Sequence, residues 1–157
     1  QQSGDELALS LPAYPPQPVA MPDWVDALGT GPRECHNYKG SYHLLLFDNS
    51  DQVRAIAPDF KTLAQIGDDQ FICTAPGKDC DVISRVFVPG AGVDEDSVTG
   101  SAHAVLTPFW AARLGRERFS AYQASARGGR LTCTLKGDRA ILGGKCFTVV
   151  EGQFRTR

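Results

Sequence analysis

The residues of this chain with the clearest chemical potential lie in one short stretch, from Glu95 to His103. Asp96 is an acid that can donate or accept a proton, and Ser101 offers a hydroxyl group five residues later. Between them, Thr99 and Gly100 open an apolar segment with the composition of a helix start. The first N–H groups of a helix have no partner within it and suit a carboxylate or a phosphate. An acid beside such a turn predicts an enzyme that isomerises or racemises a small acid.

Each of these residues also has a purely structural interpretation. Asp96 could be a helix N-cap or a solvated loop acid, Thr99 is most simply the N-cap, and Ser101 could satisfy a first-turn amide. We favour a functional role for Asp96 and Ser101. The Ser101 hydroxyl and the N–H groups of Gly100 and Ser101 can hold a substrate carboxylate, since glycine lets a ligand approach the backbone.

The other charged residues nearby, and the remaining histidines, are interpreted structurally. Asp94 and Glu95 are predicted to be loop charges that aid solubility, and His103 is predicted to be a core histidine with its hydrogen bonds satisfied. His36 and His43 have no carboxylate or cysteine partners at ligand spacing, so no metal site is predicted.

The elements that position the stretch are a strand and a helix. An apolar run over 82–88 predicts a strand that leads into it, and a helix is predicted over 102–112. Only His103 and Thr107 are polar in that helix, and a helix that is apolar all round is a buried one. Pro108 should remove one internal hydrogen bond and kink it.

The rest of the chain reads mainly as short strands separated by turns. This pattern predicts an α+β fold in which a rolled mixed or antiparallel sheet, barrel-like, surrounds one buried central helix. Residues 48–51 are predicted to form a hairpin turn, and two short helices are predicted over 22–28 and over 58–66, the second ended by Gly67. The other predicted strands cover residues 6–11, 33–38, 42–47, 52–56, 71–75, 119–123, 130–136, 139–142 and 145–150.

Composition restricts the class of protein. The chain has 157 residues, 42% hydrophobic and 22% charged, with a net charge of −2 and no basic block, so nucleic acid is not an expected partner. No apolar run approaches the ~18 residues that a membrane-spanning helix needs. Five cysteines without C-x-x-C spacing predict reduced thiols in a cytoplasmic protein. A single disulfide between two of them is the alternative that the sequence leaves open. A start at Gln1 instead of methionine predicts a fragment, a processed product or a trimmed chain.

The central stretch resembles a motif of the PhzF (phenazine biosynthesis-like) isomerase family. Residues 95–102 read E-D-S-V-T-G-S-A, close to the family pattern E-D-x-x-T-G-S-A, with Ser97 where proline is common. The segments over 108–115, 122–131 and 143–146 also match. The resemblance implies a diaminopimelate-epimerase-like fold of two similar lobes, each with a central helix in a rolled sheet, and an active site between them. It further implies that residues 21–157 form the C-terminal lobe. Residues 1–20 then hold the end of the first lobe and a proline-rich linker.

Family members use a glutamate on the first lobe to shuttle the proton, helped by a histidine there. An aspartate and a serine of the second lobe complete the pocket, and their positions match Asp96 and Ser101, with Thr99 and Gly100 in the substrate-binding turn. No residue of this chain matches the glutamate or that histidine. The cysteines also do not match the two-cysteine acid–base pair of related amino-acid epimerases.

The expected function is therefore that of the C-terminal lobe of a cofactor-independent isomerase that transfers a proton at carbon in a small carboxylate-bearing substrate. The expected partner is the first lobe of the same protein, without which this chain should be inactive. Two alternatives stay open: a non-catalytic binding or scaffold module, and a homodimer formed through the apolar face that a missing lobe would leave exposed.

Overall fold

A computed structural model describes residues 2–3, 6–146 and 149–155 of the chain. These residues form an α+β fold with one large mixed sheet, three α-helices and two 3-10 helices. The helices are η1 (Asp23–Leu28), α1 (Ser50–Ala55), α2 (Phe60–Ala64), η2 (Pro89–Ala91) and α3 (Gly100–Leu114). The strands are β1 (Gln2–Ser3), β2 (Glu6–Pro12), β3 (Gln17–Val19), β4 (Glu34–Tyr38), β5 (Tyr42–Leu46), β6 (Gln70–Pro76), β7 (Val82–Val88), β8 (Val93–Glu95), β9 (Arg118–Gln123), β10 (Gly129–Lys136) and β11 (Arg139–Lys145).

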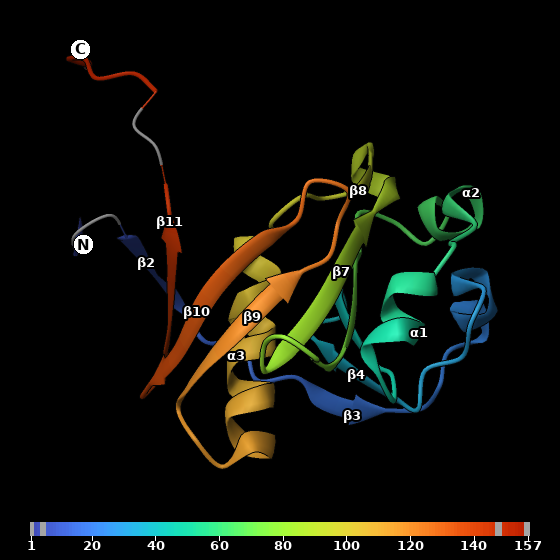
Figure 1. Ribbon diagram of the computed structural model, residues 1–157. Helices are drawn as coiled ribbons and strands as arrows, with labels where there is room; N and C mark the ends of the chain where they lie inside the picture. The colour runs from blue at the N-terminus through green and yellow to red at the C-terminus, as the bar shows by residue number, and fades with distance from the viewer. Residues whose placement is uncertain (1, 4–5, 147–148, 156–157) are drawn as a thin grey trace.

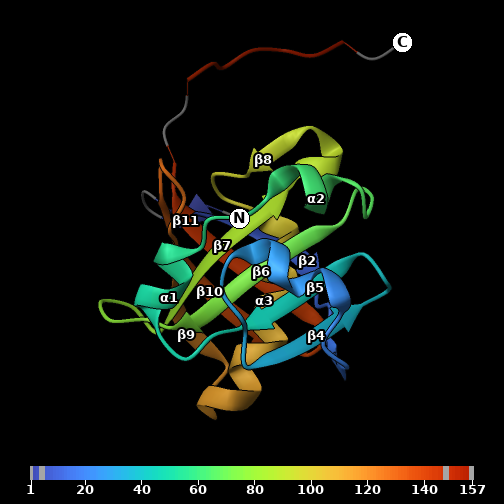
Figure 2. The ribbon, with the colours of Figure 1, turned by 90° about the vertical axis from the view of Figure 1, so that its right-hand side faces the viewer.

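The sheet is curled but open. Its strand order is β1-β2-β11-β10-β9-β7-β6-β5-β4-β3, with β8 paired to β7 outside this path. The pairs β5–β6 and β7–β9 are parallel, and the other pairs among the described residues are antiparallel. Because β1 and β3 do not pair with each other, the predicted barrel-like closure is wrong. The predicted buried central helix corresponds to α3, but α3 is not the only helix that packs on the sheet, since α1 and α2 lie beside the sheet on the side away from α3 (Figures 1 and 2).

Helix α3 is buried along most of its length in the concave side of the sheet. The side chains from Ala102 to Thr107 are fully buried, and α3 contacts β2, β10 and β11 as well as β5. A helix without a polar face must be covered from several directions, because each exposed apolar side chain would forfeit about 1.5–3 kcal/mol of burial free energy. The curl of the sheet provides this cover.

Pro108 lies inside α3 and leaves one carbonyl without its helical donor. That carbonyl belongs to Ala104, and it accepts a hydrogen bond of 2.9 Å from the backbone N–H of Tyr14 instead. The proline-rich crossover between β2 and β3 is thereby fixed to the middle of α3. The lost hydrogen bond is replaced by a tertiary one, while the predicted kink stays a prediction.

A second apolar core lies on the convex side of the central strands. Successive side chains of a strand point to opposite faces of the sheet, so Leu44 and Leu46 face α3 while Leu45 faces the outer helices. This outer core joins the sheet to η1, α1 and α2, and its central members are Leu28, Val53, Leu63, Phe47, Phe71 and Phe87. Strands buried on both faces explain the continuous apolar runs in the sequence.

The predicted hairpin over 48–51 and strand over 52–56 are wrong, because α1 occupies this region. The Asn49 side-chain oxygen accepts hydrogen bonds from the N–H groups of Asp51 (3.1 Å) and Gln52 (3.0 Å). Asparagine is among the strongest N-cap residues, and here it starts a helix where we expected a turn. The predicted strand over 145–150 is wrong over 149–150, since β11 ends at Lys145, and residues 147–148 lie outside the described residues.

Two further expectations concern cysteines and membranes. All five cysteines are free thiols, and Cys35, Cys73 and Cys133 are buried. The longest helix in the described part of the chain is α3, with 15 residues, and no helix there combines the length and the apolarity needed to cross a membrane.

Candidate active site

The turn between β8 and α3 holds Asp96 in a defined position. The Asp96 backbone N–H donates to the Val86 carbonyl of β7 at 3.0 Å. The Asp96 side-chain atom Oδ2 accepts a hydrogen bond of 2.6 Å from the Thr99 hydroxyl. The carboxylate is half-buried, and no second partner for it is present among the described residues. One carboxylate oxygen is therefore fixed and the other is available to a ligand.

Gln123 of β9 anchors this turn from the core. Its side chain is fully buried, its amide nitrogen donates to the Asp96 carbonyl at 2.7 Å and to the Thr99 hydroxyl oxygen at 3.1 Å, and its amide oxygen accepts from the Thr99 N–H at 2.8 Å. Buried amides of this kind lock a loop because breaking the network leaves unpaired polar groups. Gln123 was not among the site residues predicted from the sequence. The available signal was a polar side chain at an inward position of a strand, in register with Phe119 and Ala121.

The N-terminus of α3 is left open. Thr99 is the N-cap residue, as predicted, but its side chain makes no capping hydrogen bond, because its hydroxyl donates to Asp96. The N–H groups of Gly100 and Ser101 have no acceptor within the part of the chain that the structure describes. These groups and the helix dipole make this end of α3 suited to an anion.

Ser101 is held by a second glutamine that the sequence analysis missed. Gln70, the first residue of β6, donates to the Ser101 hydroxyl oxygen at 2.9 Å, and the hydroxyl lies 3.2 Å from the Gln70 amide oxygen. Ser101 is half-buried and makes no hydrogen bond with Asp96. The structure thus brings Asp96, Thr99 and Gly100 together, and it holds Ser101 one residue further on with a separate partner.

An apolar groove runs past the open helix end. It has a volume of about 740 Å³, includes Gly100 and Val98, and does not include the Asp96 and Ser101 side chains. Leu7 and Leu9 of β2 line it and are 48% and 54% exposed. The remaining lining comes from Ala8 and from residues 127–131 and 142–146. We call it the Gly100 groove.

The residues interpreted as structural have defined partners. Glu95 is not a free loop charge, because its carboxylate pairs with the Arg85 guanidinium at 2.7 and 2.9 Å, so that interpretation is wrong. His103 is fully buried, and its Nδ1 lies 2.7 Å from the Thr99 carbonyl while its Nε2 has no partner among the described residues. Burial lowers the pKa of His103 below its ordinary value. The expectation of full hydrogen bonding is therefore met for one ring nitrogen only.

Each of the other two histidines lies beside one carboxylate. His36 lies 3.0 Å from a Glu34 oxygen, and His43 lies 2.8 Å from an Asp69 oxygen. Across the described residues, no group of three or more histidine, cysteine, aspartate or glutamate side chains is placed to hold a metal ion.

Comparison with known proteins identifies one family. The family model described as "Phenazine biosynthesis-like protein" (PhzC-PhzF) matches residues 34–152. Two Pseudomonas aeruginosa proteins, both named uncharacterized isomerases, are each 41% identical to the chain over 153 and 152 residues. These alignments cover 97% and 96% of this chain but 58% of each relative.

Solved structures give the same result. A PhzF-family crystal structure from Enterococcus faecalis matches with a TM-score of 0.86 and 37% identity, covering 92% of this chain and 55% of that one. A putative PhzC/PhzF protein from Clostridium difficile matches with a TM-score of 0.85 and 28% identity, covering 98% and 60%. The chain therefore spans less than two thirds of the length of these proteins.

Proposed function

The chain belongs to the phenazine biosynthesis-like (PhzC-PhzF) family, and from this membership we propose that it is one lobe of a two-lobed isomerase that transfers a proton at a carbon atom of a small carboxylate-bearing substrate. The open N-terminus of α3 carries this proposal. Fifteen helical residues direct their dipole at N–H groups that have no acceptor in the described structure, beside a positioned carboxylate.

In the proposed complex, the substrate carboxylate accepts hydrogen bonds from the Gly100 and Ser101 N–H groups and from the Ser101 hydroxyl. Hydrogen bonds to a charged partner are worth roughly 1.5–3 kcal/mol each. Gly100 leaves room for this approach, because it has no side chain and its nearest neighbours are the ends of Leu11 and Leu9. Thr99 keeps its hydroxyl on Asp96 and so leaves the helix end to the substrate.

Asp96 is proposed to hold or deliver a proton opposite a base from the other lobe. Its carboxylate is oriented by Thr99, and its main chain is fixed by Gln123, which is the preorganisation that proton transfer requires. The base is a glutamate in the part of the family fold that these residues do not cover. Proton transfer of this kind needs no redox cofactor, because no electrons leave the substrate.

The other lobe is proposed to pack over the Gly100 groove and exclude water from the site. The exposed leucines Leu7 and Leu9 support this arrangement, since a contiguous apolar surface is typical of an interface. Water exclusion would strengthen the interactions of Asp96 and of the helix N-terminus with the substrate.

The test combines this chain with a chain that covers the remaining length of its relatives. The mixture is incubated in D₂O with a panel of small cyclic and amino-acid-derived carboxylates, and deuterium entering carbon positions is measured by mass spectrometry. We expect exchange in the mixture and none with either chain alone. If no substrate of the panel exchanges in a mixture whose two chains form a complex, the proposed proton transfer is contradicted.

A second proposal is that two copies of this chain associate through the same face. The exposure of Leu7 and Leu9 favours it, because self-association would bury them in the absence of the other lobe. Such a dimer would be a binding or scaffold module without the glutamate. Light scattering distinguishes the cases: a monomer at high concentration excludes the dimer, and a dimer that Leu9→Lys dissociates supports it.

A further inference from the structure

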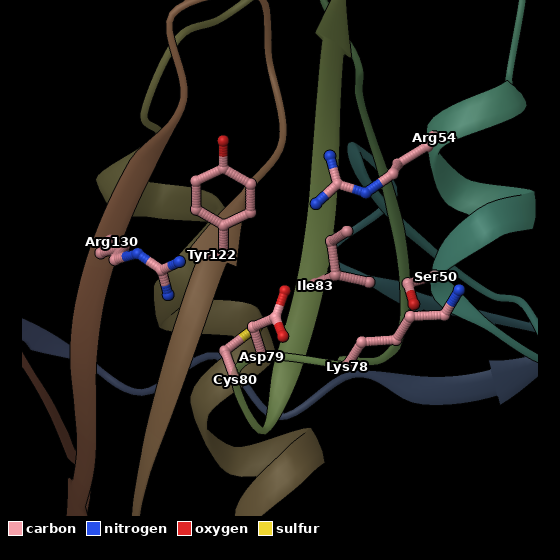
Figure 3. A pocket seen from close by; sticks show the side chains of 8 residues that line it. All are labelled: Ser50, Arg54, Lys78, Asp79, Cys80, Ile83, Tyr122 and Arg130. Carbon is pink, nitrogen blue, oxygen red and sulfur yellow. The ribbon is translucent and has the colours of Figure 1, made fainter.

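A second cavity lies on the convex side of the sheet, between α1, the loop that joins β6 to β7, and strands β9 and β10 (Figure 3). Its volume is about 190 Å³. Tyr122 and Ile83, which are register partners on β9 and β7, form its floor. Arg54, Arg130 and the loop over 78–80 surround it. We call it the arginine pocket.

Two guanidinium groups face this pocket across one aromatic ring. The Arg54 and Arg130 guanidinium carbons lie over the Tyr122 ring, 5.5 and 5.2 Å from its centroid. Figure 3 shows the two side chains reaching Tyr122 from opposite sides, Arg54 from α1 and Arg130 from β10. Stacking on an aromatic face orients a guanidinium and leaves its N–H donors free for a ligand.

Neither of these guanidinium groups is neutralised by an ion pair in the described structure. The nearby Asp51 carboxylate is paired with Lys78 at 2.7 Å. The Asp81 carboxylate is occupied by Arg116 and by the Ser120 N–H at 2.7 Å.

The remaining groups of the lining do not balance the two positive charges. Asp79 is the one acid among the lining residues, and its side chain makes no ion pair in the described structure. Burial raises the pKa of the Cys80 thiol, so this group is uncharged at neutral pH. The pocket therefore keeps a positive charge that an anion would stabilise.

We propose that the arginine pocket binds a small oxyanion with two negative charges, namely a phosphate group, between Arg54 and Arg130. Guanidinium groups match phosphate oxygens with two parallel hydrogen bonds. A volume of about 190 Å³ is roughly six times the ~30 Å³ share of one water molecule, which accommodates a tetrahedral oxyanion. It is below the ~300–1,000 Å³ that is typical of drug-sized ligands.

This site lies on the other face of β9 from the Asp96 turn, although Arg130 also lines the Gly100 groove. Tyr122 points to the convex face of β9, and the next residue, Gln123, points to the concave face and holds Asp96. The proposal does not depend on the isomerase function, because phosphate binding can be measured with this chain alone.

The experiment is calorimetric titration of the chain with inorganic phosphate, with phenyl phosphate and with chloride at constant ionic strength. We expect saturable binding of phosphate and none of chloride. Tighter binding of phenyl phosphate than of inorganic phosphate would identify a phosphate monoester as the ligand, and equal or weaker binding would identify the free ion.

Substitutions then locate the bound phosphate. Arg54→Gln and Arg130→Gln should each raise the dissociation constant at least about tenfold, since each removes charge-assisted hydrogen bonds. Arg118→Gln, the same charge change outside the pocket on β9, the strand that carries Tyr122, should leave the dissociation constant unchanged. Asp79→Asn should lower the dissociation constant, because it removes a repelling charge.

Near-UV circular dichroism checks that each variant is folded. Absence of saturable binding, or equal effects of the Arg54, Arg130 and Arg118 substitutions, would overturn the proposal.

Discussion

The two ends of α3 are built in opposite ways. At the C-terminal end, Gly115 adopts the left-handed conformation (φ 64°) and its N–H donates to the Ala111 carbonyl. Arg113 of the last turn pairs with Glu34 and lies over the Phe109 ring at 4.4 Å. At the N-terminal end, Thr99 turns its hydroxyl to a neighbouring acid and leaves the first N–H groups without an acceptor among the described residues.

The N-terminal end of α3 is the less stabilised of its two ends. A side-chain cap at the helix N-terminus is worth about 1 kcal/mol, and this helix does without one. The C-terminal end has every device that closes a helix: a left-handed glycine, a basic residue and a backbone hydrogen bond. We therefore interpret the open end as the binding end, and the following variants test that interpretation.

The largest effect is expected on activity at the open end. In the proposed two-lobed protein, Asp96→Asn should lower kcat/KM about 10²- to 10⁴-fold, because an amide cannot exchange the proton. Arg113→Gln at the closed end should leave kcat/KM unchanged. Deuterium exchange rates measure both, and thermal unfolding checks that each variant folds. Equal loss in both variants would remove the functional distinction between the two ends.

A large loss of stability is expected when the anchor of the open end is removed. Gln123→Leu should lower the free energy of unfolding by about 2–3 kcal/mol, because the Thr99 N–H and the Asp96 carbonyl lose their partner. Tyr122→Phe, at the adjacent residue that points to the other face, is the control and should change stability little. Urea unfolding of the chain measures both values. A Gln123→Leu variant as stable as the control would show that the network is dispensable.

Replacing the glycines at the two ends of α3 by alanine should change the free energy of unfolding in opposite directions. Gly115→Ala should cost about 1–2 kcal/mol, because alanine is strained in the left-handed conformation. Gly100→Ala should leave stability unchanged or raise it by up to about 1 kcal/mol, since a Cβ there would meet only ordinary contacts at 3.7 Å and alanine favours helix. Urea unfolding compares the variants, and substrate affinity in the two-lobed protein should fall only for Gly100→Ala. Losses of equal size would contradict the assignment of the open end.

The smallest effect concerns the histidine in the first turns of α3. Burial lowers the folded-state pKa of His103 below 6.5, so the unfolded chain binds a proton at a higher pH than the folded chain does. The stability from the neutral ring is present above pH 6.5. It is lost as the pH falls from 6.5 to the folded-state pKa, with a slope of at most about 1.4 kcal/mol per pH unit.

The measurement for His103 is the free energy of unfolding from pH 7.5 to 5, obtained with urea. His103→Asn should flatten this dependence over the window below pH 6.5, whatever its effect on absolute stability. A variant with the same slope as the unmodified chain would show that other groups cause the pH dependence.

Local pattern predicted the start of α3 better than it predicted the fold around it. The helix start at Thr99 and Gly100 follows from residue types alone, while the functional role of Asp96 and Ser101 stays a prediction. The same local reasoning failed at 48–56, where Asn49 is compatible both with a turn and with an N-cap. The choice between them depended on Val53 finding a place in the outer core.

The charged and amide residues illustrate what local pattern cannot supply. Glu95 looked like a solvated loop acid, yet Arg85, ten residues earlier, donates to both of its carboxylate oxygens through Nε and one terminal guanidinium nitrogen. Gln70 lies 31 residues from Ser101, and Gln123 lies 27 residues from Asp96 and 24 from Thr99. Such contacts depend on how the chain folds, so spacing in the sequence does not predict them.

The burial of α3, and the acid, hydroxyl and glycine at its N-terminus, were predictable from the residues of this one segment. The open helix end beside Thr99, the unclosed sheet and the contacts of Arg54 and Arg130 with Tyr122 were not, and they became visible only in the folded chain. Each of these depends on distant segments packing together, because a hydrogen bond or a charge contact exists only where the fold brings both partners within a few ångströms.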